Sequence, residues 1–301
     1  MMTRSATNTA VRIAALSLLV GAAVLALKAF AAAATGSIAL FSDALESIVN
    51  VATAVATLVA VRLAARPASA SLPYGYHKAE YFSAVLIGIF IAVAALVIFQ
   101  QAWTGFVAPR PFDADPVGIG VSVVATGLNA GWAWWLVRQG RKERSPALVA
   151  DGRHLWTDVV STAGVLLGVM LAAVTGWGQL DAILAALVGV TILWSGWELI
   201  KQSVIGLMDV AVEPKELARI REIIAANADG ALEAHDVRTR RAGKMSYVEF
   251  HLVVPGAMSV EAAHTICDQI ESALRAAIAD TQVTIHVEPE AKAKHSGIVV
   301  L

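Results

Sequence analysis

Two apolar stretches of the chain carry the same pattern of polar side chains. Its members stand at positions i, i+3 and i+7, and they are Asp43, Glu46 and Asn50 in the first stretch and Asp151, His154 and Asp158 in the second. In an α-helix these positions share one face, and the last two lie one turn apart. An ionisable side chain is costly inside a membrane-spanning helix, so each one is a candidate functional residue.

Two such helices facing one another would bring four donor side chains to one point. The donors are Glu46, Asn50, His154 and Asp158, and four is the number that a tetrahedral site for Zn²⁺ or a related cation requires. With His154 neutral, the two carboxylates balance the charge of one divalent cation. In a poor solvent the same carboxylates favour protons, and metal binding releases them. The pattern therefore predicts exchange of a divalent metal for protons. His154 and Glu46 are the best candidates to carry these protons.

A structural hydrogen-bond network between helices is the alternative interpretation of these residues. A single polar residue would leave both interpretations open, whereas two matched motifs favour the metal site. Asp43 and Asp151 stand nearer the predicted helix starts, so we assign them a supporting or capping role behind the ligands.

Composition places these motifs in a membrane. The chain is 57% hydrophobic and 16% charged, against about 45–50% and 25% in soluble domains. Before residue 210 the excess comes in apolar blocks, each near the length of about 20 residues that a spanning helix needs. The predicted spans are about 11–34, 38–64, 80–105, 115–138, 148–174 and 180–204.

Basic residues predict how these spans are oriented. They cluster before the first span, between the second and third, between the fourth and fifth, and after the sixth, whereas the loops on the other side hold only Arg110. Because basic loops stay in the cytoplasm, we expect both termini to be cytoplasmic, as an even number of spans also requires.

Residues 210–290 have the composition of a soluble domain. The predicted order is helix, strand, strand, helix, strand, over 214–228, 231–241, 246–254, 259–279 and 281–287. The expected fold class is thus an all-α six-helix transmembrane bundle (1–209) followed by a small cytoplasmic α+β domain (210–290). Residues 291–301 are interpreted as a mobile tail.

The soluble domain holds a second group of metal-binding residue types. They are His235, His251, His264, His286 and Glu288. A single histidine is usually a satisfied surface residue, but this domain holds four of the seven histidines of the chain. Imidazole and carboxylate suit Zn²⁺ and its neighbours, so we predict a cytoplasmic metal site here.

The two intramembrane motifs and the domain order resemble the cation diffusion facilitator family, of the bacterial zinc and ferrous-iron efflux type. The resemblance implies a homodimer in the bacterial inner membrane that exports divalent metal in exchange for protons by alternating access. It also implies that the cytoplasmic site is regulatory and draws two soluble domains together, and that Lys78 and Asp209 form a salt bridge that locks the dimer. Asn50 departs from the family's usual acidic residue, which leaves Zn²⁺ or Fe²⁺ as the favoured substrate, with Mn²⁺, Co²⁺ and Cd²⁺ as further candidates.

Two other functions remain as alternatives: a membrane metal sensor that does not transport, and a membrane metalloenzyme. The sensor would leave the intramembrane donors without a role. The sequence has no H-E-x-x-H motif, no nucleophile with an evident base and no phosphate-binding loop, so we expect neither an enzyme nor an ATP-driven pump. We expect no organic cofactor and no nucleic-acid partner; the partners are metal ions, protons, the lipid bilayer and a second copy of the chain.

Overall fold

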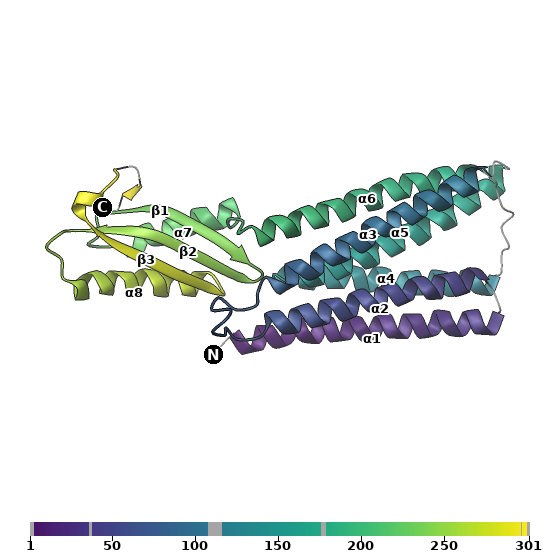
Figure 1. The fold of residues 1–301 in the computed structure, drawn as a ribbon, viewed down its shortest axis with the longest axis horizontal. Helices are drawn as coiled ribbons and strands as arrows, with labels where there is room; N and C mark the ends of the chain where they lie inside the picture. Colours follow the sequence, from purple (N-terminus) through teal and green to yellow (C-terminus); the bar gives the residue numbers. More distant parts are fainter. Residues whose placement is uncertain (1–2, 36–37, 108–115, 176–178, 296, 300–301) are drawn as a thin grey trace. The chain divides into compact units, whose positions relative to one another are not determined.

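The computed structural model describes residues 3–35, 38–107, 116–175, 179–295 and 297–299 (Figure 1). The chain divides into two compact units, residues 1–204 and 205–301. The first unit is helical and the second combines helices with a sheet, so the predicted succession of a helical membrane region and a small domain of helices and strands is confirmed.

Six long helices make up the first unit, and the last of them continues for a few residues past the boundary at residue 204. They are α1 (Thr3–Thr35), α2 (Ile38–Ala64), α3 (Ala79–Val107), α4 (Pro116–Lys142), α5 (Pro146–Thr175) and α6 (Gln179–Leu207). Within the described residues, α1, α2, α3 and α6 are long and apolar enough to cross a membrane. Six spans therefore stay a prediction.

The helices of this unit pack in one connected network. The α1 helix contacts α2 and α4, and α5 contacts α4, α3 and α2. Small residues allow the close approaches: a Cβ atom at Gly152 of α5 would lie 2.6 Å from Val137 Cγ2 of α4. Because Gly152 follows Asp151 directly, α4 lies close to the polar motif of α5, as helices with small residues at their contacts do in membranes.

The second unit has the predicted order of helices and strands. It contains α7 (Pro214–Asn227), β1 (Glu233–Ala242), β2 (Met245–Val254), α8 (Val260–Ala277) and β3 (Thr281–Pro289). The α8 helix starts where predicted, because the Ser259 hydroxyl accepts a hydrogen bond from the Ala262 amide at 3.1 Å and so caps the helix. The two helices pack on the sheet over a core that includes Ile224, Phe250 and Ile270.

A fourth strand follows the predicted elements. After β3 come a short 3₁₀ helix (Glu290–Lys292) and β4 (Ile298–Val299), and the sheet order is β3-β2-β1-β4. The β1 strand pairs antiparallel with β2 and β4, while β2 and β3 are parallel. The expectation of a mobile tail after residue 290 did not include these elements, because a two-residue strand has no sequence periodicity to recognise.

Candidate metal centres

Three histidines lie in one row across the sheet. His235 of β1 is opposite His251 of β2, and His251 is opposite His286 of β3. The ring centres of neighbouring histidines are 5.3 Å and 5.0 Å apart. Phe250 and Leu252, on either side of His251, are buried in the core, so alternation along β2 directs His251 away from the core.

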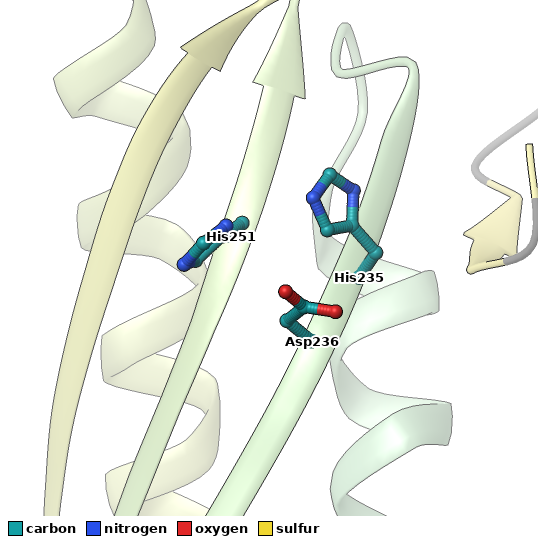
Figure 2. A group of neighbouring side chains, drawn as sticks. All are labelled: His235, Asp236 and His251. Atoms are coloured by element: carbon teal, nitrogen blue, oxygen red, sulfur yellow. The ribbon is translucent and has the colours of Figure 1, made fainter. Parts of the chain in front are cut away.

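Asp236 joins this row although the sequence analysis did not select it. The donor atoms of His235, Asp236 and His251 all lie within 4.8 Å of one another (Figure 2). Consecutive residues of a regular strand point to opposite faces, but the register of β1 shifts between His235 and Arg238, and Asp236 has a φ of 53°. This bulge turns the Asp236 side chain toward the side chain of His235. The sequence signal that could have found it is the pair of adjacent metal-binding residue types.

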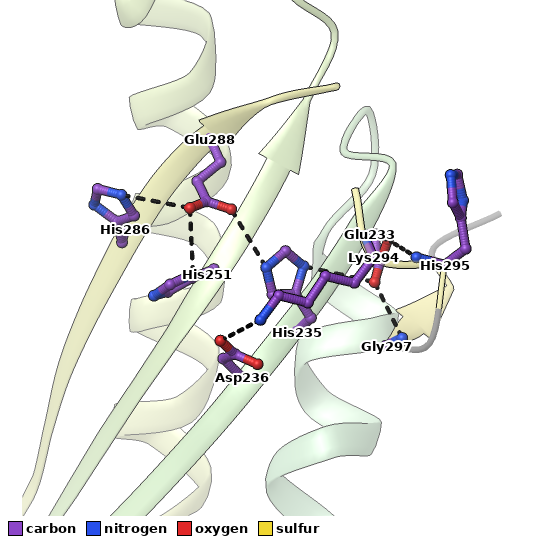
Figure 3. A network of polar contacts seen from close by, with 9 residues as sticks. All are labelled: Glu233, His235, Asp236, His251, His286, Glu288, Lys294, His295 and Gly297. Atoms are coloured by element: carbon purple, nitrogen blue, oxygen red, sulfur yellow. Dashed lines mark hydrogen bonds and ion pairs between the residues drawn. The ribbon is translucent and has the colours of Figure 1, made fainter. Parts of the chain in front are cut away.

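Glu288 connects the three histidines (Figure 3). Its carboxylate oxygens lie 3.3 Å from His235 Nε2, 3.4 Å from His251 Nδ1 and 3.7 Å from His286 Nε2. These are ion-pair distances, yet both ring nitrogens of His235 and Nδ1 of His251 are buried and form no hydrogen bond. Because buried polar atoms normally have partners, imidazole nitrogens and carboxylate oxygens that converge without bonding are a donor set that fits a metal ion.

The remaining histidine of the predicted cytoplasmic site has a different neighbour. His264 Nδ1 of α8 lies 3.4 Å from Asp268 Oδ1, one turn along the same helix, and both side chains are exposed. Membership of His264 in the metal site stays a prediction.

Asp236 also has a cationic partner. The Lys294 ammonium donates a hydrogen bond of 2.6 Å to Asp236 Oδ2. This hydrogen bond lowers the pKa of Asp236 below its usual value, against a smaller opposing effect of burial. Asp236 is therefore ionised at neutral pH, as a metal ligand must be.

In the helical unit, the paired motifs of α2 and α5 meet. Asn50 Nδ2 of α2 donates a 2.7 Å hydrogen bond to Asp158 Oδ2 of α5. Asn129 of α4 directs its Nδ2 at the same oxygen, at 3.5 Å. All three residues are buried, so three helices converge on the Asp158 carboxylate. The sequence analysis did not select Asn129, which stands alone in an apolar stretch.

His154 lies one helical turn before Asp158. Only 6% of its surface is exposed, and neither of its ring nitrogens has a hydrogen-bond partner; the same holds for Asn50 Oδ1. Asn50 Oδ1 and the unprotonated ring nitrogen of neutral His154 are thus available to a ligand. Glu46 and Asp43 occupy positions on α2, but their side chains lie outside the described residues.

Asp151 lies inside α5 rather than at its start, and it holds three helices together. Ser17 Oγ of α1 donates a 2.7 Å hydrogen bond to Asp151 Oδ2, and Trp132 Nε1 of α4 donates to Ser17 Oγ at 3.1 Å. Asp151 is 1% exposed. This chain of hydrogen bonds fixes the position of α5 at Asp151, about one helical turn before His154.

Residues 14–208 match the cation efflux transmembrane domain, and residues 212–290 match the cytoplasmic domain of cation efflux proteins. This chain belongs to the cation efflux family. The family consists of transporters, which agrees with the expectation that the protein is not an enzyme, and its cytoplasmic domain is a dimerisation domain.

Relatives in this family match the cation efflux protein over most of its length. An uncharacterized transporter of Synechocystis sp. is 43% identical over 276 residues, or 92% of this chain and 89% of the relative. The cation-efflux pump FieF of Salmonella newport is 32% identical over 270 residues, or 89% and 88% of the two chains. Among solved structures, the metal-bound C-terminal domain of the CzcD transporter from Thermotoga maritima is 29% identical, covers 28% of this chain and 100% of its own, and has a TM-score of 0.25.

The predicted dimer salt bridge concerns one residue in each unit of the cation efflux protein. Asp209 follows α6, and its Oδ1 lies 3.2 Å from Arg240 Nη1 of β1. Lys78 directly precedes α3. The pairing of Lys78 with Asp209 stays a prediction.

Proposed function

We propose that this cation efflux protein is a secondary transporter that exports divalent metal ions from the cytoplasm in exchange for protons, by alternating access. Zn²⁺ and Fe²⁺ are the favoured substrates. The observation that carries the proposal is the 2.7 Å contact between Asn50 of α2 and Asp158 of α5, with the unbonded ring nitrogens of His154 one turn away. Glu46, one turn before Asn50 on the same helix face, completes the proposed donor set.

Asn50 can support the site in two ways at once. Its Nδ2 holds Asp158, while its Oδ1 is buried without a hydrogen bond and can face the metal. Two carboxylates, one amide oxygen and one imidazole make an oxygen-rich site with a single nitrogen donor. This set suits Zn²⁺ and Fe²⁺ and also admits Mn²⁺ and Co²⁺.

Charge supports the coupling to protons. The carboxylates of Glu46 and Asp158 together neutralise one dication. Once the metal leaves, two carboxylates close together in a medium of low dielectric constant favour proton uptake. Metal release and proton binding are thus linked at the same side chains, and alternating exposure of the site to the two sides of the membrane would produce exchange.

The cytoplasmic cluster of His235, Asp236, His251, His286 and Glu288 is proposed as a regulatory metal site. Its buried, unbonded imidazole nitrogens support this role. In a homodimer, metal at this site would draw the two soluble domains together, with Lys78 and Asp209 locking the dimer. We propose that the protein acts in the bacterial inner membrane, with both termini in the cytoplasm.

Metal flux into proteoliposomes tests this function. Zn²⁺, Fe²⁺, Mn²⁺, Co²⁺ and Cd²⁺ are tested separately, with and without an imposed proton gradient. The proposal predicts flux of one or more of these metals that rises with the gradient. Folded, dimeric protein without flux of any metal, but with metal-dependent movement of the soluble domain, would favour a membrane sensor instead.

A further inference from the structure

The segment after β3 folds back along the sheet beside the cytoplasmic cluster. We call residues 290–295 and 297–299 the C-terminal strap. Its strand β4 pairs with β1 at Glu233 and Ala234, the residues directly before His235. The match to the family's cytoplasmic domain ends at residue 290, so all of the strap after its first residue lies beyond the matched part of the chain.

A buried carboxylate ties the strap to β1. Glu233 is 4% exposed, and its two oxygens accept the backbone N–H groups of Lys294 at 3.1 Å, His295 at 3.0 Å and Gly297 at 3.0 Å (Figure 3). A carboxylate that accepts several N–H groups is a strong, charge-assisted anchor. Glu233 Oε1 also lies 3.5 Å from His235 Nδ1, so the anchor of the strap is a neighbour of the metal cluster.

The strap also packs directly against His235. A Cβ atom at Gly297 would lie 2.5 Å from the Ala234 carbonyl oxygen and 2.9 Å from His235 Cβ. Only glycine fits so close to the strand, since any side chain would force the strap away. The position of the strap is therefore sensitive to the surroundings of His235.

One side chain of the strap reaches the cluster itself. Lys294 Nζ lies 2.6 Å from Asp236 Oδ2, and Asp236 is the carboxylate of the group formed with His235 and His251. Lysine donates hydrogen bonds and carries a positive charge, but it cannot bind a metal while protonated. An ammonium group and a metal cation therefore compete for the same carboxylate.

We propose that the C-terminal strap is a built-in competitor of the regulatory metal: Lys294 holds Asp236 until a metal ion takes this carboxylate, and metal binding then loosens the strap. This inference rests on the proposed cytoplasmic metal site. Competition at one carboxylate lowers the affinity of the cluster for metal. By thermodynamic linkage, bound metal lowers the equilibrium constant for docking of the C-terminal strap on Asp236 by the same factor. The strap thus sets the metal concentration at which the cluster fills.

Metal affinity and strap protection test the proposal in the full-length protein. All proteins carry Asp158→Ala, so that binding reports the cytoplasmic cluster, and Zn²⁺ affinity is measured by competition with a chromogenic chelator. Lys294→Gln should tighten Zn²⁺ binding about two- to fivefold, the range for a partly exposed ion pair. Lys292→Gln removes the same charge from the exposed strap surface and should leave the affinity unchanged. In an Asp236→Asn background, Lys294→Gln should lose its effect.

Hydrogen exchange supplies the second readout. Zn²⁺ should increase exchange at the amides of Lys294, His295 and Gly297 in the protein with an intact strap. Equal affinities of the Lys294→Gln and Lys292→Gln proteins, or amide protection that Zn²⁺ leaves unchanged or raises, would overturn the competitor proposal. If His251→Ala binds Zn²⁺ as well as its parent, the cytoplasmic metal site itself is wrong, and the strap proposal fails with it.

Discussion

Asn50 and Asp158 stand 108 residues apart in the sequence, and a buried hydrogen bond of 2.7 Å joins their side chains. One comes from α2 and the other from α5, the two helices that carry the repeated polar motif. Because Asp158 is a buried carboxylate, a missing donor would leave its charge poorly compensated. The contact therefore links the position of the two helices to the charge state of the site.

Replacing Asn50 should weaken metal transport. Asn50→Leu removes both the donor to Asp158 and the amide oxygen, and hydrogen bonds to charged groups contribute about 1.5–3 kcal/mol. We expect the KM for Zn²⁺ flux to rise about tenfold or more. Ile48→Leu, on the exposed surface of the same helix, is the matched control. An unchanged KM in the Asn50→Leu protein would argue against Asn50 as a ligand.

Asn129 should have a smaller effect than Asn50. Its Nδ2 lies 3.5 Å from Asp158 Oδ2, which is at the limit of a hydrogen bond. Asn129→Leu should raise the KM for metal flux by less than Asn50→Leu does, measured in the same proteoliposomes. A larger effect of Asn129→Leu would mean that α4 contributes a ligand to the site.

Ser17 should matter for stability. Ser17→Ala removes a donor from buried Asp151 and an acceptor from Trp132, and an unsatisfied buried polar group costs about 1–3 kcal/mol or more. The unfolding free energy in detergent should fall by that amount. Ser161→Ala, a partly exposed serine of α5, should change it little. Equal stabilities of the two variants would show that this network does not hold the helices.

The ionisation of Asp236 should depend on the strap. The hydrogen bond from Lys294 lowers the pKa of Asp236 in the folded protein, so this contact stabilises the fold above the unfolded-state pKa of about 3.9. Its contribution is lost as the pH falls through the lower folded-state pKa. The carboxyl NMR signal of Asp236, in chelator-treated protein, should titrate at lower pH in the wild type than in Lys294→Gln. Coincident titrations would contradict the contact.

The sequence alone predicts that the members of each polar motif share one helix face, because helical periodicity places them there whatever the tertiary contacts are. It likewise predicts the order of elements in the soluble domain, where apolar alternation and the Ser259 cap are local signals. Asp236 could not be assigned, because a bulge, set by the pairing of β1 with β2, turns its side chain. The roles of Asn129 and Ser17 could not be assigned for a related reason. Their partners lie on other helices, and a single amide or hydroxyl in an apolar stretch has no periodicity.

Flux through the wild-type protein and the Asp158→Ala protein, measured side by side in proteoliposomes under a proton gradient, tests the central claim most directly. Asp229→Ala, an exposed aspartate of the soluble domain, is the control, and size-exclusion chromatography shows that all three proteins are folded and dimeric. We predict gradient-dependent metal flux in the wild type and the control, and none in the Asp158→Ala protein. Retained flux in Asp158→Ala would contradict the assignment of the transport site.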